Sequence, residues 1–327
     1  MTVYFVLLPG TLLIDLAGPA DAVRLANRYQ RSVRFVSKFI GPAPSVSTSV
    51  GITLANLEPL PDVIPDDAMI VVCGTVTEMS APKTRQSVAT WLRRVAKPTH
   101  RLVFICAGAL VAAEAGFLDG RACTTHHEDC DELRRVAPKA KVLDNRLYVM
   151  DGQVYTSAGV TAGVDLMLAL IAEIAGPKCA VAIARHMVVY ARRTGADPQL
   201  SPWLEGRNHI HPGLHRAQDA IAANPAHAWT STELATVAST SARHLTRLFQ
   251  LHAAMSPIDY VHRLRVALAR ELLTNSTLDL ERVAQRSGFG SSRQLRRVWN
   301  KYNASPPSQS RQTLGQSQPK VPAVTHP

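Results

Sequence analysis

A nine-residue pattern that occurs twice restricts the fold of the C-terminal part of this chain more than any other feature. The copies are SARHLTRLF at 241–249 and SSRQLRRVW at 291–299, which share Ser, Arg, Leu and a second Arg before two apolar or aromatic residues. A shorter helical segment and a break precede each copy, at 231–240 and 280–289. Two short helices joined by a tight turn, the second of them basic, are typical of a helix-turn-helix.

The helical period divides each basic segment into an apolar and a polar face. The apolar faces comprise Leu245, Leu248, Phe249 and His252 in the first copy and Leu295, Val298 and Trp299 in the second. The polar faces comprise Arg243, Thr246, Arg247 and Gln250 in the first copy and Ser292, Arg293, Arg296, Arg297 and Asn300 in the second. Arg binds guanine in the major groove, Gln and Asn bind adenine, and all can contact phosphate. One such helix alone indicates only a solvated surface, but two copies favour DNA binding.

A helix at 257–274 is predicted between the copies, and it would set the distance between them. Its apolar residues on or near one side are Ile258, Val261, Leu264, Leu268 and Leu272. The charge supports the same interpretation, because the net charge is +11. Residues 196–327 hold 15 Lys and Arg against 8 Asp and Glu, whereas residues 1–195 hold 21 against 17. The excess of positive charge is therefore concentrated at the C-terminal end, as expected for a polyanionic partner.

No secretory signal or membrane span is predicted. The apolar start at 3–8 is short and lacks a preceding basic region, and the apolar stretches at 102–118 and 160–176 contain carboxylates and are too short to cross a bilayer. Five cysteines without a repeated spacing do not describe a disulfide framework. A cytoplasmic protein without membrane partners is expected.

The first 190 residues alternate short apolar runs with helix-period segments, which predicts a mostly parallel sheet with helices on both faces. The expected strands are 4–8, 33–37, 69–73, 102–105 and 153–156, and the expected helices are 14–29, 84–95, 109–115, 164–174 and 179–190. The predicted domains are an α/β domain at 1–193, a linker at 194–212, an all-α DNA-binding domain with two helix-turn-helix units at 213–304 and a disordered tail at 305–327.

Cys106 is the first candidate for chemistry in the α/β domain. It follows the apolar strand 102–105 and precedes a helix of small residues, so the helix N-terminus is expected to favour its thiolate. Asp15 and His126 follow other strands of the same sheet and are expected at the same edge. Taken singly, Cys106 is more simply a packing residue and Asp15 a charge at the start of a helix.

The C-terminal part resembles the AraC/XylS family of transcriptional regulators, whose DNA-binding domain has two helix-turn-helix units and a linker helix. The resemblance covers about 229–311 and includes Glu233-Leu-Ala, Ser256-Pro-x-x-Tyr260 and Gly288-Phe-Gly-Ser291 besides the repeat. It departs at Ser239, where the family often has Gly, and at 305–308, where an aromatic residue is common. The resemblance implies that Arg243, Thr246, Arg247, Ser292, Arg293, Arg296 and Arg297 face the bases.

The N-terminal part resembles the PfpI/ThiJ superfamily, with its glutamine-amidotransferase-like fold. In that family an elbow cysteine, an acid and a histidine line one pocket, and Cys106, Asp15 and His126 match these places. Asp15 is one methylene shorter than the usual Glu, and Ala107 replaces a usual Thr, so a pocket is favoured over turnover. Together the halves resemble the GlxA-type branch of AraC regulators, which respond to small nitrogen-containing metabolites.

The resulting prediction is a DNA-binding regulator that senses a small molecule, needs no cofactor and forms a homodimer, with RNA polymerase as a further partner. The alternative is a cysteine-dependent hydrolase or glyoxalase-like enzyme that carries a DNA-binding domain. Cys123, His126, His127 and Cys130 have the donor types of a metal site, but the matching family needs no metal, and none is expected. His209, His211 and His215 are interpreted as a solvated linker.

Overall fold

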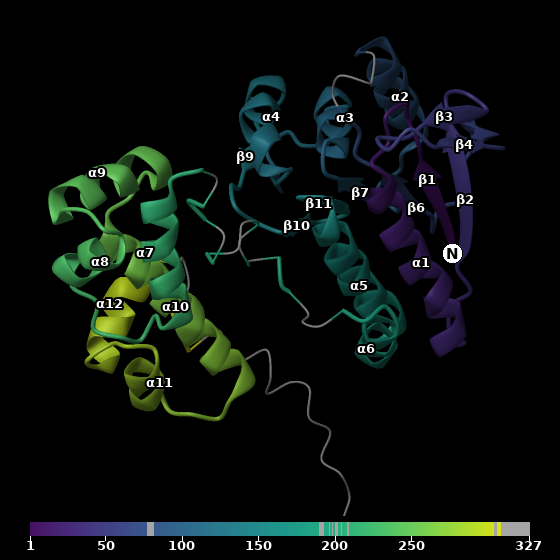
Figure 1. Cartoon of the computed structure of the whole chain (residues 1–327). Helices are drawn as coiled ribbons and strands as arrows, with labels where there is room; N and C mark the ends of the chain where they lie inside the picture. The colour runs from purple at the N-terminus through teal and green to yellow at the C-terminus, as the bar shows by residue number, and fades with distance from the viewer. Residues whose placement is uncertain are drawn as a thin grey trace, which may run out of the picture. The chain divides into compact units, whose positions relative to one another are not determined.

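The computed structural model describes residues 1–76, 82–189, 193–195, 197, 199, 202–203, 205–207, 209–303 and 306–308. They divide into two units, Met1–Gln199 and Leu200–Pro327, each with its own hydrophobic cores (Figure 1). The predicted tail lies outside the described residues except for 306–308. No described helix is both long enough and apolar enough to cross a membrane.

The first unit is built on a seven-stranded sheet with the order β10-β11-β7-β6-β1-β2-β5. Its strands are β1 (Thr2–Val6), β2 (Val36–Gly41), β5 (Glu58–Pro59), β6 (Met69–Val72), β7 (Arg101–Ile105), β10 (Tyr148–Asp151) and β11 (Val154–Ser157). All neighbours are parallel except β10 and β11. Two small pairs are β3 (Ser45–Ser47) with β4 (Thr53–Ala55), and β8 (Ala122–Cys123) with β9 (Lys141–Val142).

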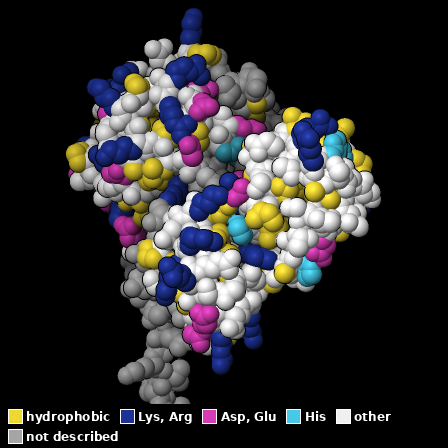
Figure 2. All heavy atoms as spheres, turned by 90° about the vertical axis from the view of Figure 1, so that its left-hand side faces the viewer, with side chains coloured by type: hydrophobic (Ala, Val, Ile, Leu, Met, Phe, Trp, Pro, Cys, Tyr) yellow, Lys and Arg dark blue, Asp and Glu magenta, His cyan; other side chains and the backbone are white. Residues whose placement is uncertain are grey.

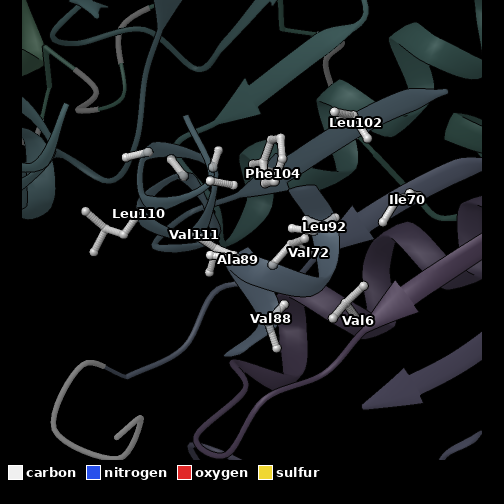
Figure 3. Packing of buried hydrophobic residues seen from close by; sticks show 14 of the residues in the cluster. Val6, Ile70, Val72, Val88, Ala89, Leu92, Leu102, Phe104, Leu110 and Val111 are labelled. Carbon is white, nitrogen blue, oxygen red and sulfur yellow. The ribbon is translucent and has the colours of Figure 1, made fainter. Parts of the chain in front are cut away.

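Helices cover both faces of this sheet, because successive strand residues point to opposite sides and both sides are apolar. Along β1, Val3 and Phe5 pack with α1 (Leu13–Tyr29), α5 (Thr161–Ala175) and α6 (Pro177–His186). Tyr4 and Val6 pack on the other face, with α2 (Pro82–Val95) and α3 (Gly108–Glu114). Figure 3 shows this second face, where Val6, Ile70, Val72 and Phe104 meet residues of α2 and α3. A short 3₁₀ helix (His127–Asp129) leads into α4 (Cys130–Val136).

The predicted α/β class is confirmed, while several element ends differ from the prediction. The strand expected at 33–37 begins at Val36, because the Asn27 side chain hydrogen-bonds both the backbone N–H and the carbonyl of Phe35 at 2.8 Å. The helix expected at 179–190 begins at Pro177 and ends at His186, and Val188 then takes a left-handed φ of 55°. The short strands β3, β4, β5, β8, β9 and β10 were missed, since two to four residues carry almost no period.

The regular structure described in the second unit is helical. They are α7 (Pro212–Ala223), α8 (Ser231–Val237), α9 (Ala242–Ala253), α10 (Pro257–Asn275), α11 (Leu280–Arg286) and α12 (Ser292–Tyr302). The first half of α10 packs on α7, α8 and α9, and its second half packs on α11 and α12. The buried face therefore changes along α10. This corrects the prediction of one stripe, because Ile258 is 37% exposed whereas Tyr260, Val266 and Leu273 are buried.

Candidate functional site

The first helix-turn-helix joins α8 to α9, and side chains cap both helices. The Thr230 hydroxyl accepts the Glu233 N–H at 3.1 Å, and the Ser241 hydroxyl accepts the His244 N–H at 3.3 Å. Each cap satisfies a backbone donor that the first helical turn leaves free. Between the helices, Ser239 takes a left-handed φ of 57°. The chain therefore reverses at the residue that replaces the family's usual glycine.

The second helix-turn-helix, α11 and α12, repeats this construction. The Asp279 carboxylate accepts the Arg282 N–H at 2.8 Å, and the Ser291 hydroxyl accepts the Gln294 N–H at 3.2 Å. The left-handed residue is here Gly288, with a φ of 81°. The sequence repeat is thus also a repeat of caps and turn geometry.

Both second helices bury their apolar faces and leave their polar faces accessible. The buried residues are Leu245, Leu248 and Phe249 on α9 and Leu295, Val298 and Trp299 on α12. The exposed residues are Arg243, Thr246, Arg247 and Gln250 on α9 and Arg293, Arg296, Arg297 and Asn300 on α12, while Ser292 is half-buried. Figure 2 shows Lys and Arg side chains spread over the face of the molecule that it draws, among fewer acidic ones.

Some of these polar groups have partners within the protein. The Thr246 hydroxyl donates to the Ala242 carbonyl at 2.9 Å, and an Arg247 guanidinium nitrogen lies 3.0 Å from His244 Nδ1. The Ser292 N–H donates to Glu281 Oε2 at 3.1 Å. The side chains of Arg293, Arg296 and Arg297 make no hydrogen bond or ion pair with another described residue. Within the described part of the chain, the donors of these three guanidiniums are therefore accessible.

The histidines before α7 are packed, which corrects their interpretation as a solvated linker. His211 Nδ1 accepts the Leu214 N–H at 3.3 Å and caps α7. The His209 ring stacks on His215 at 4.1 Å and lies 5.3 Å from the His252 ring of α9. Partial burial lowers the pKa of His209. These side chains therefore stabilise the N-terminus of α7 and its packing against α9.

Cys106 occupies a sharp turn between β7 and α3, with a φ of 53°. It is 5% exposed, and two glycines lie directly against it. A Cβ on Gly159 would lie 2.2 Å from the Cys106 Cβ, and one on Gly74 would lie 2.6 Å from it. Any side chain at either glycine would displace the cysteine.

Asp15 lies in α1, and its side chain lies next to Gly74, as Cys106 does. A Cβ on Gly74 would lie 2.4 Å from Asp15 Oδ2, so the carboxyl and the cysteine adjoin the same glycine. Asp15 is fully buried, and its Oδ1 accepts the Val160 N–H at 2.6 Å. Oδ2 has no hydrogen-bond partner among the described residues. Burial raises the pKa of Asp15 to about 7, although the N–H of Val160, hydrogen-bonded to Oδ1, and the nearby backbone of Gly74 oppose the shift.

The expected thiolate at Cys106 is wrong. Burial raises the pKa of this thiol far above its ordinary value, and the negative charge of Asp15 raises it further. The backbone hydrogen bond at Ala107 acts in the opposite direction but is weaker. Desolvation therefore outweighs the dipole of α3, which has only seven residues.

Asp15 and Cys106 lie against the same glycine, Gly74, but no described contact links His126 to either residue. His126 is half-buried, and its Nδ1 lies 3.7 Å from Glu128 Oε2. In the described chain no hydrogen bond links it to Cys106 or Asp15; its neighbour Thr125 instead donates its hydroxyl to the Cys106 carbonyl at 2.9 Å. Ala107 is 5% exposed at the start of α3.

Cys123 lies on β8, and Cys130 lies at the start of α4. Burial raises the pKa of each thiol to about 11. Among the described residues, no group of three or more His, Cys, Asp and Glu could hold a metal ion.

Sequence reasoning did not assign roles to Gly74, Gly159, Val160 or Thr125. The available signals were a glycine directly after the strand 69–73 and another after the strand 153–156. Close approach of a backbone to a functional side chain is a common reason for glycine at such places.

Comparison with known proteins matches both halves. The model of the DJ-1/PfpI family matches residues 1–173, and that of a helix-turn-helix domain matches residues 234–313. The HTH-type transcriptional regulator CdhR of Pseudomonas aeruginosa is 31% identical over 330 residues, covering 99% of this chain and 94% of CdhR. The regulator GlxA of Rhizobium meliloti is 30% identical over 226 residues, 69% of each chain.

Two further relatives match the α/β unit. Isonitrile hydratase of Pseudomonas putida is 30% identical over 175 residues, covering 53% of this chain and 71% of the hydratase. The crystal structure of a putative transcriptional regulator protein from Vibrio parahaemolyticus superposes with a TM-score of 0.51 at 17% identity, covering 57% of this chain and 98% of that one. This likeness concerns the fold alone.

An α/β unit with a buried Cys and Asp, followed by two capped helix-turn-helix units, defines a one-chain DNA-binding regulator with a ligand-sensing type of domain. The similarity to CdhR extends over nearly the full length of both chains. The chain belongs to the AraC-type HTH transcriptional regulators that carry an N-terminal DJ-1/PfpI domain.

Proposed function

We propose that α9 and α12 enter the major groove and that their exposed polar faces read the operator. The proposed contacts are Arg243, Thr246, Arg247 and Gln250 on α9 and Ser292, Arg293, Arg296 and Arg297 on α12. The observation that carries this proposal is that each helix buries one apolar face, with Leu245, Leu248 and Phe249 on α9 and Leu295, Val298 and Trp299 on α12, and leaves its arginines accessible.

Arg247 and Arg297 carry most of the base preference in this proposal. Both are exposed and occupy the same place in the repeat. Thr246 and Ser292 contribute less, since the Thr246 hydroxyl is bonded to its own helix and Ser292 is half-buried. A bidentate Arg–guanine contact discriminates by about 1–3 kcal/mol against another base.

The first unit senses a small, nitrogen-containing metabolite at the site of Asp15, Cys106, Ala107 and His126. The unpartnered, buried Oδ2 of Asp15 supports this, because an N–H donor or a cation there would satisfy it. The relative named isonitrile hydratase acts, by its name, on a nitrogen compound. Binding that differs between two states of the protein would change its affinity for DNA.

Turnover is not part of this function. The Cys106 thiol is held protonated by burial, and His126 pairs with Glu128. The second candidate is nevertheless an enzyme, which the elbow geometry of Cys106 and the likeness to isonitrile hydratase favour. An assay with isonitriles and α-oxoaldehydes decides: turnover that disappears in Cys106→Ser while DNA binding persists would establish the enzyme.

The protein acts in the cytoplasm as a homodimer, assembled through the first unit, and contacts RNA polymerase at its promoter. Two chains present four recognition helices, which lengthens the operator. Sedimentation with and without operator DNA tests the dimer.

The proposal as a whole is tested by footprinting the DNA upstream of the protein's own gene at two salt concentrations with random DNA as competitor. A discrete protected site that survives competition supports sequence-specific reading. Uniform binding that disappears with salt would reduce the arginines to phosphate contacts.

A further inference from the structure

Two residues in the described part of the segment at the end of the first unit, Arg193 and Gln199, hydrogen-bond to the rest of that unit through their side chains. The segment comprises Arg193, Thr194, Asp197 and Gln199, which we call the latch. Within it, the Thr194 N–H donates to Asp197 Oδ2 at 2.6 Å, so the latch folds into a turn. Its contacts with the rest of the first unit are a backbone hydrogen bond from the Leu147 N–H to the Asp197 carbonyl and the hydrogen bonds of Arg193 and Gln199.

Arg193 forms the first tie, at the start of α5. Its Nε donates to Asp165 Oδ2 at 3.0 Å, and its Nη2 donates to Thr161 Oγ1 at 2.7 Å. The Asp165 side chain is only 5% exposed, so this is a nearly buried ion pair. Such pairs are costly to break from one side, because the remaining charge stays buried.

Gln199 forms the second tie, on the loop after β8. Its Nε2 donates to the Thr125 carbonyl at 2.7 Å and to the Arg146 carbonyl at 3.0 Å. Its backbone N–H donates to Asn145 Oδ1 at 2.8 Å. One side chain therefore holds two separate loops of the first unit together.

Both ties adjoin the buried Cys and Asp. The residue before Thr161 is Val160, whose N–H binds Asp15 Oδ1. Thr125, whose carbonyl accepts Gln199, donates its own hydroxyl to the Cys106 carbonyl. Arg193 therefore bonds to the residue next to Val160, which binds Asp15. Gln199 bonds to Thr125, which itself binds Cys106.

Residues 205–207, which follow the latch in the chain, make ion pairs and a hydrogen bond with helices of the second unit. Glu205 forms an ion pair with Arg263 of α10, and Arg207 forms one with Asp219 of α7. The Gly206 carbonyl accepts the Gln218 side chain at 2.8 Å. Residues 205–207 are therefore bonded to α7 and α10, which pack in one core with the recognition helix α9.

We propose that the latch is the allosteric switch of this regulator: ligand binding at the Cys106–Asp15 site shifts Val160 or Thr125, releases Arg193 and Gln199, and thereby changes DNA affinity. This inference rests on the proposed sensing function, and it adds which residues transmit the signal. The two arrangements of the latch are the two states that a ligand would bias.

The latch is tested in the full-length protein without any ligand, using Arg193→Ala and Gln199→Ala. Arg193→Ala leaves the buried Asp165 carboxylate without its cation and could destabilise the fold. Gln199→Ala leaves no buried charge unpaired, so it tests the latch without that effect. Matched controls are Arg185→Ala and Gln86→Ala, whose side chains are exposed and make no hydrogen bond or ion pair with another described residue. Hydrogen exchange of peptides at 145–147 and 193–199 reports release, and affinity for a duplex selected from a random library reports transmission.

Both latch variants are expected to speed exchange in these peptides by roughly tenfold or more, as follows from removing a charge-assisted or buried hydrogen bond. The Leu147 N–H is diagnostic, because it donates to the Asp197 carbonyl at 3.1 Å. Operator affinity is expected to change by about fivefold or more, the lower end of ordinary allosteric coupling. The control variants should match the wild type in both measurements.

Faster exchange with unchanged operator affinity would overturn the latch as a switch while leaving DNA reading intact. Unchanged exchange would overturn it as well. A wild type that selects no sequence would instead contradict the proposed function, and the exchange measurement, which needs no DNA, would still decide whether the latch is held.

Discussion

Replacing Asp15 by Asn should change the pH dependence of stability of the first unit. The carboxyl is fully buried, and among the described residues only its Oδ1 accepts a hydrogen bond, from the Val160 N–H. Asn retains an oxygen for that donor and removes the charge. Because burial raises the pKa of Asp15 from 3.8 to about 7, the folded protein holds a proton that the unfolded chain has already released.

The sign follows from proton linkage. Well below pH 3.8 the carboxyl is protonated in both states, and its contribution is fully present. As the pH rises toward 7 only the unfolded chain loses the proton, so the free energy of unfolding falls; above 7 the loss is constant. At about 1.36 kcal/mol per pH unit, the interval from pH 5 to pH 7 corresponds to roughly 2–3 kcal/mol. Asp15→Asn should remove this loss.

The assay is guanidinium unfolding at pH 5, 6, 7 and 8, followed by pulsed hydrogen exchange of a peptide from β7, which reports the first unit only. The stability difference between Asp15→Asn and wild type should grow in favour of the variant by roughly 2–3 kcal/mol between pH 5 and pH 8. Asp21→Asn, on an exposed residue of the same helix paired with Arg24, is the control and should show no such trend. A difference that is flat across this range would refute the reasoning.

Three further expectations concern other residues. Ser239→Gly should stabilise the second unit by about 0.5–1 kcal/mol in denaturant unfolding, because it relieves a left-handed φ of 57°; a loss of stability would contradict this. Gly288→Ala should cost roughly 2–4 kcal/mol in the same assay, since its Cβ would lie 2.6 Å from Ala226 and φ is 81°; a near-neutral effect would show that the turn relaxes. Cys106 should react with iodoacetamide at pH 7 far more slowly in the native protein than in the unfolded one, as measured by mass spectrometry, because burial keeps the thiol protonated.

The DNA-binding helices could be predicted from sequence because their signal is local. The caps Ser241 and Ser291, the apolar spacing and the breaks all lie within a few residues of one another. The helix α10 was found for the same reason. Its buried face was not, because it depends on two separate cores that only the tertiary structure defines.

The buried Cys and Asp show the opposite case. Their pairing was expected because both follow strands of one parallel sheet. The protonation of Cys106 was missed, since it depends on desolvation by segments far away in sequence, including Gly74 and Gly159. The latch was also invisible in sequence, because nothing local distinguishes Gln199 from any other polar residue in a connecting segment.

The measurement that tests the central claim most directly is selection of duplexes from a random library by the wild type and by Arg297→Ala, with Arg185→Ala as control. The wild type and the control should enrich the same discrete sequence. Arg297→Ala should bind that sequence more weakly by roughly 1–3 kcal/mol and lose preference at one base position, while its binding to random DNA changes little. Equal loss on selected and random DNA would contradict base reading by α12 and leave only contact with phosphate.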